Sequence, residues 1–428
     1  MSAAPPAGGR CSGIGLLSPA EALSMMLRDV AVVPEVETVG LLSGTGRITA
    51  REIRSPIALP RFDNAAMDGF AIHADDLGAP LPMRLALGGR IPAGAPRAVL
   101  RAGEALAINT GAWIPHGTGA VVERERASAE GGRIILEARP AAGRNVRRAG
   151  EDLREGDRLV AAGTLLDERH IALLGACGIA EATVRRRLRI GVLSTGSELV
   201  PPGAPVPPGR IVDVNRRLLA ALVQFAGPPS DLGIANDTLP DLVARLSRAR
   251  DLDLDLLITS GGVAGSDADL VQRAVTRLGG ETTTLSLALK PGKPVGFGRI
   301  GRCVALHVAG NPMAAIAGGL LFARPLAAAM TGLTGAGTSH PAHFAEAVPH
   351  RAGRTELVPA RIVRHEAGRA VIAPLGRGGS ASLSPLVAAD GMAEIPPDLD
   401  DVEPGREVEF HRFADHPFVP RGPLWRAT

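Results

Sequence analysis

The sequence predicts a multidomain α/β protein, and three observations lead to this prediction. The chain has 428 residues, 45% hydrophobic and 21% charged, which is enough for roughly two to four folded domains. Residues 188–330 repeat a strand, a small-residue loop and a helix several times, which is typical of a parallel sheet covered by helices on both faces. Short apolar runs broken by Gly and Pro lie before and after this region and indicate β-rich domains.

The first half of the chain begins with a helix and then becomes β-rich. Ser18 is a good N-cap, with Pro19 at the first helical position and Glu21 three residues after the cap. From Arg51 to about Arg139 the short apolar runs predict strands rather than helices. A helix follows from about Asp167 to Ala176 and is closed by Gly178, so we interpret this stretch as a return into a shared scaffold.

The second half contains the predicted doubly wound region. Buried strands are predicted within 188–196, 254–262 and 303–312, and helices within 213–227, 239–250, 267–279 and 313–330. Ligands bind such sheets at the carboxyl ends of the strands. From about residue 335 to the end, short strands and turns return and predict a small β domain.

Composition argues against several classes of protein. A net charge of +3 and an aromatic content of 3% do not favour nucleic-acid binding. Three cysteines, at positions 11, 177 and 303, are too far apart for a zinc motif and do not suggest disulfides. The N-terminus lacks the pattern of a signal peptide, and no uninterrupted apolar run reaches the ~18 residues of a membrane span. We therefore expect a cytoplasmic protein that binds neither nucleic acid nor membrane.

The stretch "LALKPGKPVGFG" (287–298) contains Lys290 and Lys293, the only lysines in the chain, whereas every other basic residue except histidine is arginine. Arginine replaces lysine readily where charge alone matters, but a pocket shaped around a compact ammonium does not accept the wider guanidinium. Chance is the alternative explanation. Two lysines three residues apart, between two prolines and around a glycine, favour a functional pocket.

Three strand-end loops of the doubly wound region are rich in glycine and small polar residues. They are "STGSEL" (194–199), "TSGGVAGSDAD" (259–269) and "AGNP" (309–312). Glycine lets backbone N–H groups approach an anion, and the following helix N-terminus favours negative charge. A tight strand-to-helix turn explains any one of these loops, but three loops at one edge indicate a phosphate site.

Carboxylates accompany these loops. Glu198 lies in the first loop, Asp213 precedes the first helix, and Asp267 and Asp269 follow the second loop. Carboxylates beside a phosphate site predict Mg²⁺, because this ion bridges carboxylate and phosphate oxygens. Each of them could instead be a favourable charge at a helix N-terminus, and for Asp267 the two explanations are about equal.

Further polar residues lie in the β-rich part, within "RFDNAAMDGFAI" (61–72), "NTGA" (109–112) and "RRAGEDL" (147–153). Asp63, Asn64 and Asp68 interrupt an otherwise apolar run. Composition alone favours a turn-forming role for them over a binding role.

Taken together, these stretches resemble the molybdopterin molybdenumtransferase (MoeA) family, which includes the gephyrin E domain. "FDNAAMDGFA" is similar to the family's FDNSAMDGYA, "STGSEL" to STGDEL, "TSGGVAGSDAD" to SSGGVSVGxxD, "LKPGKP" to KPGKP, and "AGNP" to PGNP. The resemblance extends from about Leu16 to Phe413, which is nearly the whole chain.

The resemblance implies four domains and a homodimer. The domains would be an elongated scaffold (16–50 and 142–186), a β-rich second domain (51–141), a molybdopterin-binding-type α/β domain (187–333) and a C-terminal β-barrel-like domain (334–428). The implied reaction is the insertion of molybdate into adenylylated molybdopterin with Mg²⁺, which releases AMP. Contacts with a molybdopterin adenylyltransferase and with recipient molybdoenzymes would follow from this role.

The resemblance also implies roles for particular residues. Catalysis would involve Glu198, Asp269, Lys290 and Lys293, and Mg²⁺ would be held by Glu198, Asp213 and Asp269. The implied substrate-binding residues are Asp63, Asp68, Thr110, Asp152, Thr195, Gly196, Asn215, Ser260, Gly261, Gly262, Pro291, Gly292, Pro294, Gly310, Asn311, Pro312, Arg361 and Ser380. Because the active site would lie between two subunits, Asp63, Thr110 and Asp152 could serve the lysines of the partner.

The chain departs from the family pattern at three places. Ala264, Gly265 and Ser266 replace the family's SVG, "AGNP" replaces PGNP, and Pro359 stands where an arginine is expected to contact molybdate. Proline has neither charge nor a side-chain donor. Two functions therefore stay open: a metal-inserting enzyme in which Arg361 replaces the lost arginine, or a non-catalytic paralogue that binds molybdopterin or finished cofactor as a carrier or scaffold.

Overall fold

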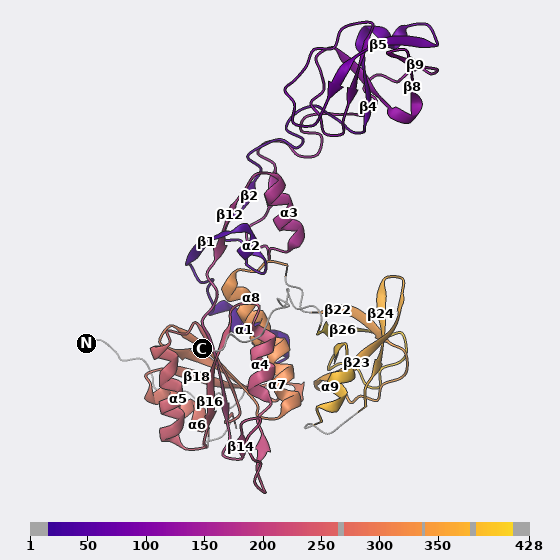
Figure 1. Cartoon of the computed structure of the whole chain (residues 1–428). Helices are drawn as coiled ribbons and strands as arrows, with labels where there is room; N and C mark the ends of the chain where they lie inside the picture. Colours follow the sequence, from indigo (N-terminus) through magenta and orange to yellow (C-terminus); the bar gives the residue numbers. More distant parts are fainter. Residues whose placement is uncertain (1–15, 264–268, 336–338, 377–381, 414–428) are drawn as a thin grey trace, which may run out of the picture.

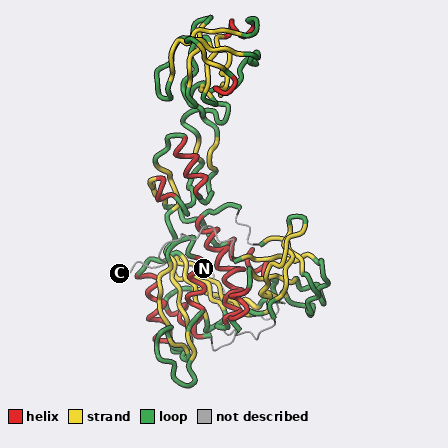
Figure 2. The backbone as a smooth tube through the Cα atoms, turned by 45° about the vertical axis from the view of Figure 1, so that its right-hand side comes forward, coloured by secondary structure: helices red, strands yellow, loops and turns green. Residues whose placement is uncertain are grey.

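The computed structural model describes residues 16–263, 269–335, 339–376 and 382–413, and these residues form four parts. Figures 1 and 2 show an elongated molecule with a β-rich domain at one end, a narrow scaffold in the middle and an α/β domain at the other end. The C-terminal β domain lies beside the α/β domain. The chain passes through the scaffold twice, once on the way to the β-rich domain and once on the way back.

The scaffold is built from two chain segments that pair with each other. β1 (Val36–Gly40) pairs antiparallel with β12 (Glu181–Arg185), and β2 (Ile53–Arg54) pairs antiparallel with β11 (Arg158–Val160). Helices α2 (Leu41–Gly44) and α3 (Glu168–Ala176) complete it. Asp167 caps α3 by accepting hydrogen bonds from the N–H groups of Arg169 and His170, so the predicted helix is confirmed. The pairing of β2 with β11 continues this contact between the two segments beyond residue 50.

The β-rich domain contains one sheet with the strand order β7-β4-β6-β5-β9-β8. Its strands are β4 (Gly69–His73), β5 (Met83–Ile91), β6 (Glu104–Ile108), β7 (Thr118–Glu123), β8 (Ser128–Glu130) and β9 (Arg133–Leu136). The short strands β3 (Asn64–Ala65) and β10 (Val146–Arg147) pair at the entrance to the domain, and the 3₁₀ turns η1 (Ala74–Gly78) and η2 (Arg124–Arg126) lie beside the sheet. The predicted absence of long helices between 51 and 139 agrees with these elements.

The α/β domain is built on a six-stranded sheet with the order β16-β13-β17-β21-β20-β18. Its strands are β13 (Ile190–Thr195), β16 (Pro229–Ala235), β17 (Leu256–Ser260), β18 (Glu281–Ser286), β20 (Pro294–Ile300) and β21 (Cys303–Val308). β16, β13, β17 and β21 are parallel, whereas β20 runs antiparallel to both of its neighbours. These four parallel strands confirm the predicted parallel sheet, and 281–300 adds to it a hairpin joined by the lysine-containing loop.

Helices cover both faces of this sheet. α4 (Asn215–Val223), α7 (Pro312–Gly318), the π-helical turn η3 (Gly319–Ala323), α8 (Arg324–Thr331) and the N-terminal α1 (Pro19–Arg28) pack on one face. α5 (Leu239–Asp251) and α6 (Leu270–Arg277) pack on the other. Successive residues of β17 alternate between the two cores, with Ile258 in the first and Leu257 in the second. Burial on both faces explains why these strands are continuous apolar runs.

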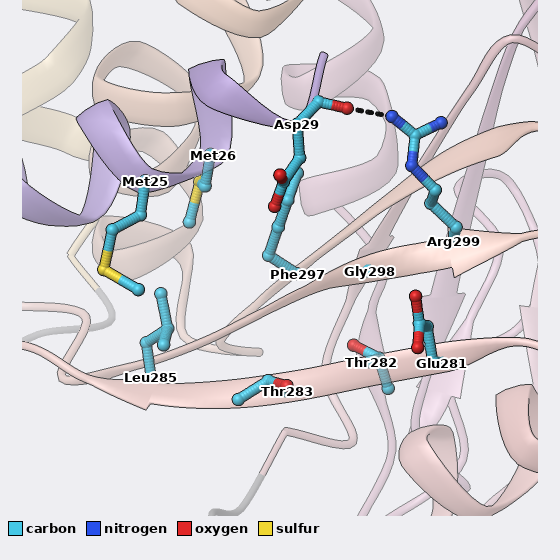
Figure 3. Close-up of a pocket in the computed structure, with 10 residues that line it drawn as sticks. All are labelled: Met25, Met26, Asp29, Glu281, Thr282, Thr283, Leu285, Phe297, Gly298 and Arg299. Atoms are coloured by element: carbon cyan, nitrogen blue, oxygen red, sulfur yellow. Dashed lines mark hydrogen bonds between the residues drawn. The ribbon is translucent and has the colours of Figure 1, made fainter. Parts of the chain in front are cut away.

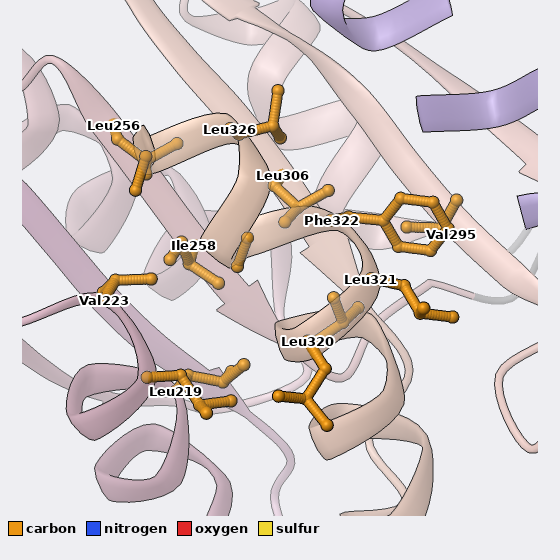
Figure 4. Packing of buried hydrophobic residues seen from close by; sticks show 14 of the residues in the cluster. Leu219, Val223, Leu256, Ile258, Val295, Leu306, Leu320, Leu321, Phe322 and Leu326 are labelled. Carbon is orange, nitrogen blue, oxygen red and sulfur yellow. The ribbon is translucent and has the colours of Figure 1, made fainter. Parts of the chain in front are cut away.

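Two adjacent glycines allow the long helical segment to lie close to the sheet and to α4. A Cβ atom on Gly318 would lie 2.6 Å from Val308 Cγ1, and one on Gly319 would lie 2.4 Å from Leu222 Cδ1. Figure 4 shows Phe322 and Leu320 of this segment packed among side chains of α4 and the sheet. Pro312–Thr331 is long and apolar enough to span a membrane, but 89% of its apolar window is buried within this fold. Its hydrophobicity is therefore explained by the core.

The C-terminal domain is a closed sheet of five strands. β22 (His340–Phe344), β23 (Thr355–Glu366), β24 (Arg369–Pro374), β25 (Gly391–Ile395) and β26 (Glu407–Arg412) pair in a ring, because β23 pairs with both β24 and β25. The short helix α9 (Ser384–Ala388) precedes β25. β19 (Leu289–Lys290) of the α/β domain adds to β23 in parallel, so the two domains share main-chain hydrogen bonds. A β-barrel-like fold for this domain was predicted and is confirmed.

The central strand β21 carries a fully buried histidine. The imidazole of His307 makes a 2.8 Å hydrogen bond through Nδ1 to Thr259 Oγ1, and burial lowers its pKa from 6.5 to about 4. A Cβ atom on Gly296 would lie 2.9 Å from His307 Cδ2, so the neighbouring strand makes room for the ring. The imidazole is therefore neutral in the folded protein at pH 7.

This burial predicts a loss of stability in acid. Between pH 6.5 and 4 the unfolded chain binds a proton at His307 that the folded chain does not, so the free energy of unfolding falls as the pH falls. The full effect is on the order of 3 kcal/mol. Urea unfolding at pH 7 and pH 4.5 should show a smaller pH-dependent loss for His307→Asn than for the unmodified protein. Equal losses in the two proteins would contradict this assignment.

Candidate active site

A pocket of about 230 Å³ lies at the carboxyl ends of β13, β17 and β21. It is lined by Thr195, Gly196, Glu198, Leu199, Ile211, Asn215, Asp237, Ser260, Gly261, Gly262 and Gly310. The three loops that the sequence analysis placed at one edge of the sheet are therefore together. Parallel strands that are neighbours in the sheet bring their carboxyl ends to the same edge, which is the physical reason for this convergence.

Glycine is required in the loop after β17. Gly261 and Gly262 have φ values of +95° and +70°, a region that side chains with a Cβ rarely adopt. A Cβ atom on Gly261 would also lie 2.3 Å from the carbonyl oxygen of Thr195. The amide of Gly196 donates to the carbonyl of Ala235, and the amide of Gly261 donates to the carbonyl of Val308. These two amides are therefore not free to bind an anion, although the glycine-rich loops predict such a role. Their contribution to the pocket is the space that a side chain would fill.

Asn215 connects the loops around the pocket. Its Nδ2 donates to Ser260 Oγ at 2.9 Å and to the carbonyl oxygen of Gly310 at 2.7 Å. Its Oδ1 and the hydroxyl of Thr195 are buried without a hydrogen-bond partner among the described residues. Buried polar atoms are rarely left unpaired in a folded protein, so both atoms are available to a polar ligand.

The three carboxylates predicted to bind Mg²⁺ are not brought together. Glu198 lies on the pocket wall above Gly196. Asp213 is buried, accepts a 2.8 Å hydrogen bond from Ser194 Oγ and forms a 3.3 Å ion pair with Arg216. Asp269 is the N-cap of α6 and accepts from the Gln272 amide. Within the described ranges, no group of three or more His, Cys, Asp or Glu side chains could hold a metal ion.

The positions of Asp213 and Asp269 are explained by the helices that follow them. Asp213 precedes α4 and Asp269 precedes α6, where a carboxylate is favoured by free backbone N–H groups. This helix-capping role is the alternative that their sequence positions also predict. Asp267 lies outside the described residues.

Asp237 is a pocket residue that the sequence analysis missed. It follows β16, the fourth parallel strand, and its carboxylate accepts a 3.0 Å hydrogen bond from the Ser197 amide. The signal was present in the sequence as "IANDT" (234–238), but the strand before it contains Pro, Ser and Asp and was not recognised as a strand.

The loop that contains the two lysines packs against α7, the helix that begins next to this pocket. A Cβ atom on Gly292 would lie 3.7 Å from the Cβ of Ala314 in α7, and Asn311, the N-cap of α7, follows the pocket residue Gly310. Pro291, Gly292, Lys293 and Pro294 close the loop, in which the Lys293 carbonyl accepts a 2.7 Å hydrogen bond from the Leu287 amide. Lys293 is exposed, and Lys290 forms a 2.9 Å ion pair with Glu356 of β23. Neither lysine is among the residues that line the pocket.

The second set of predicted residues forms two hydrogen-bonded groups in the β-rich domain. Asp68 accepts from the amide and the hydroxyl of Thr110 at 2.7 and 2.8 Å, and these bonds lower its pKa. Asp63 accepts from Arg148 Nη1 at 2.7 Å and from the Ala149 amide at 2.8 Å. Burial alone would raise the pKa of Asp63, but these hydrogen bonds outweigh it and lower the pKa. Both carboxylates are therefore ionised at neutral pH.

These groups lie far from the pocket within one chain. The β-rich domain is at the opposite end of the scaffold from the α/β domain, as Figures 1 and 2 both show. Asp152 is exposed in the turn between β10 and β11, where the chain returns to the scaffold. One subunit alone does not bring Asp63, Asp68, Thr110 or Asp152 to the pocket.

In the C-terminal domain, Pro359 and Arg361 both lie on β23. Val358 and Ala360 belong to the core of the closed sheet, whereas Leu357 belongs to the core shared with the α/β domain. Since side chains alternate along a strand, Pro359 and Arg361 share the face of Leu357, which is directed toward the α/β domain. Arg361 is exposed, and Ser380 lies outside the described residues.

A larger cavity, of about 480 Å³, lies elsewhere, between α1 and the hairpin of β18 and β20 (Figure 3). Its lining residues are Met25, Met26, Asp29, Glu281, Thr282, Thr283, Leu285, Phe297, Gly298 and Arg299. The guanidinium of Arg299 already donates to the carbonyl oxygen of Asp29. The strand-end loops are absent from this lining, so we regard the smaller pocket as the candidate active site.

Comparison with known proteins identifies the family to which the chain is similar. Residues 17–178 match the MoeA N-terminal region (domain I and II), residues 191–329 the "Probable molybdopterin binding domain", and residues 341–413 the MoeA C-terminal region (domain IV). A molybdopterin molybdenumtransferase of Haemophilus influenzae is 33% identical over 403 residues, which cover 92% of this chain and 98% of that protein. The chain belongs to the molybdopterin molybdenumtransferase family.

Other members of this family resemble the chain over most of its length. Molybdopterin molybdenumtransferase 2 of Mycobacterium tuberculosis is 32% identical and covers 87% of this chain and 94% of its own. A crystal structure of a MoeA protein of molybdopterin biosynthesis from Pyrococcus horikoshii has a TM-score of 0.78 and 31% identity, and covers 93% of this chain and 99% of its own. The predicted family and fold class are thus confirmed.

The geometry of the pocket predicts the effect of removing a glycine. Gly261→Ala should place a methyl group against the Thr195 carbonyl and weaken molybdopterin binding by at least about tenfold, since the loop must move. Gly279→Ala is the matched control, because Gly279 also has a positive φ (+73°) but a Cβ atom there meets nothing within 4 Å. Both variants lose about 1 kcal/mol from backbone strain. Fluorescence titration with molybdopterin distinguishes them, and equal affinities would rule out this role of Gly261.

Proposed function

We propose that this chain inserts molybdate into adenylylated molybdopterin and releases AMP, in the biosynthesis of the molybdenum cofactor. The observation that carries the proposal is the arrangement of three strand-end loops around one pocket, next to the helix α7 against which the loop with the only two lysines of the chain packs. This pocket lies in the region that matches the molybdopterin-binding family, and relatives that cover 92% and 87% of this chain are named molybdopterin molybdenumtransferase.

The pocket suits a phosphorylated heterocycle. Ser260, Asn215 and Thr195 offer hydroxyl and amide groups on one wall, and Gly261, Gly262 and Gly310 leave space for the ligand. Asn311 and Pro312 begin α7 at the same edge. We assign the binding of the pterin and its phosphate to these residues. Lys293 and Lys290 would then neutralise the charge that develops on phosphate and molybdate oxygens during cleavage of the phosphoanhydride bond.

Mg²⁺ fits this pocket through oxygen ligands. Glu198 and Asp237 are carboxylates on its wall, and Asn215 Oδ1 lacks a hydrogen-bond partner among the described atoms. Since Mg²⁺ is usually held by one or two carboxylates together with substrate phosphates, Glu198 with Asp237 would hold it when substrate is bound. When bound, the ion would neutralise charge on the phosphate oxygens. We do not assign Asp213 and Asp269 to Mg²⁺, because they make structural contacts with Ser194, Arg216 and the Gln272 amide.

Arg361 is proposed to replace the arginine that the family has at position 359. It lies on the same face of β23 as Pro359, two residues along the strand, and is exposed. Positions 359 and 361 are about 6.6 Å apart along the strand. The long arginine side chain at 361 can extend over this distance toward the place that a side chain at 359 would occupy. The guanidinium offers paired donors for an oxyanion such as molybdate. This assignment favours the metal-inserting enzyme over the carrier.

A homodimer is proposed because the predicted site residues are divided between the ends of the chain. Asp63, Asp68, Thr110 and Asp152 lie in or next to the β-rich domain, and the pocket lies in the α/β domain. A symmetric dimer in which the β-rich domain of one subunit reaches the pocket of the other would complete two equal sites. We further propose a cytoplasmic location, with a molybdopterin adenylyltransferase and recipient molybdoenzymes as transient partners.

The reaction can be tested directly with pure protein. Incubation with adenylylated molybdopterin and Mg²⁺ should release AMP at a rate that rises on addition of molybdate. Arg361→Ala should raise the KM for molybdate by about ten- to a hundredfold, because it removes a charge-assisted contact. Pro359→Arg should lower that KM in the Arg361→Ala background. AMP release is followed by chromatography.

The controls separate the two functions that the sequence leaves open. Arg369→Ala, on β24, removes an exposed arginine of the same domain whose partner is Glu407, and it should leave the KM unchanged. Tight binding of adenylylated molybdopterin without any AMP release would instead identify a carrier or scaffold.

Sharing of the site between subunits predicts complementation. Lys293→Met and Asp68→Asn should each abolish most activity, but a mixture refolded together should recover about a quarter of the normal rate. The reason is that half of the dimers are mixed, and each mixed dimer contains one intact site. AMP release is measured before and after mixing. No recovery in a mixture shown to contain mixed dimers would contradict a shared site.

A further inference from the structure

Lys290 is joined to the C-terminal domain by a buried carboxylate. Its Nζ lies 2.9 Å from Glu356 Oε1. Glu356 is 8% exposed, whereas the Lys290 side chain keeps 55% of its surface accessible. The ammonium therefore has one side fixed by Glu356 and another side open to solvent or to a ligand.

The other oxygen of the Glu356 carboxylate contacts a histidine. His350 Nδ1 lies 3.0 Å from Glu356 Oε2, and the imidazole is 2% exposed. A carboxylate only accepts hydrogen bonds, so Nδ1 carries the proton in this contact. The backbone amide of His350 is itself fixed by Asp401 Oδ1 at 2.9 Å. Lys290, Glu356 and His350 thus form a chain of contacts that leads from the surface into the C-terminal domain.

The main chain supports this arrangement. Lys290 and Glu356 are directly paired in the short parallel ladder of β19 and β23, and the Thr355 amide donates to the Ala288 carbonyl at 2.8 Å. The lysine is therefore fixed both through its backbone and through its side chain.

We propose that Glu356 and His350 are positioning residues that hold the Lys290 ammonium toward the substrate. The proposal rests on the proposed function, because it assumes that Lys290 contacts the substrate. Glu356 occupies one of the three N–H donors of the ammonium and leaves two for phosphate or molybdate oxygens. A guanidinium at position 290 would engage the carboxylate through two donors of its planar fork, which points its remaining donors elsewhere. This geometry explains why lysine is kept here in a chain that otherwise uses arginine.

A purely structural role is the alternative, since an ion pair between two domains also stabilises their contact. The two roles differ in what happens once Lys290 is removed. If Glu356 acts through Lys290, its substitution has no further effect on the reaction in the absence of that lysine. If Glu356 only stabilises the domain contact, its substitution lowers activity by a similar factor in either background.

The test is a double-mutant cycle with Lys290→Gln, Glu356→Gln and the double variant, followed as kcat/KM for AMP release. We expect about a ten- to a hundredfold loss for each single variant and no more than about a twofold additional loss in the double variant. His350→Asn should retain most activity because the amide can donate in place of Nδ1, whereas His350→Leu should lose as much as Glu356→Gln.

The chain provides a matched control in the same domain. His411 Nε2 lies 2.7 Å from Glu394 Oε2, a second histidine–glutamate pair to which neither lysine of the chain contributes. Glu394→Gln should leave kcat/KM unchanged even where it lowers the unfolding temperature. Multiplicative losses in the cycle, or an equal loss for Glu394→Gln, would overturn the proposal.

Failure of the proposal can be separated from failure of the proposed function. If the unmodified protein releases no AMP, the same cycle is measured as the Kd of adenylylated molybdopterin. Coupling of Lys290 and Glu356 in that affinity would support the positioning role, and independent effects would reject it.

Discussion

The candidate site depends on the strand order of the α/β sheet. β13, β17 and β21 are parallel neighbours, so residues 195–198, 260–262 and 310 meet at one edge although more than a hundred residues separate the first loop from the last. Asn215 then fixes the loops against one another through Ser260 and Gly310. The pocket is rigid on this side because its walls are the ends of strands buried on both faces, and rigid elements hold binding groups more accurately than free loops.

The hairpin of β18 and β20 connects this site to the C-terminal domain. The loop between its strands carries both lysines, lies against α7 and contributes β19 to the neighbouring sheet. A movement of the C-terminal domain would therefore move Lys290 relative to the pocket, while Glu356 and His350 would follow the movement. Under the proposed function, a movement of this domain would therefore change the position of the Lys290 charge relative to the substrate.

Much of the fold followed from the sequence because its signals are local. Ser18 with Glu21, Asp167 with Gly178, and the apolar runs of β13, β17 and β21 each determine an element by capping or by burial. The roles of carboxylates were less predictable. Asp213 and Asp269 have the sequence context expected of metal ligands. In the structure, however, Asp213 forms an ion pair with Arg216, and Asp269 accepts a hydrogen bond from the Gln272 amide. Glu356 and His350 gave no local signal, because their significance arises from pairing with Lys290 across 66 residues of chain.

Pro359, at the position where the family pattern predicts an arginine, is informative for the same reason as the two lysines. This chain uses arginine at almost every basic position, so a general preference for arginine would have kept one there rather than removed it. A proline at this point of β23 is tolerated because the neighbours of Pro359 still pair with β25 across the same stretch. The side-chain face toward the α/β domain is unchanged, and the next residue on it is Arg361. A guanidinium at position 361 points from the same face of β23 as one at position 359 would, but it starts two residues further along the strand. If Arg361 contacts the oxyanion, its pocket is expected to lie nearer the far end of β23 than a guanidinium at position 359 would place it.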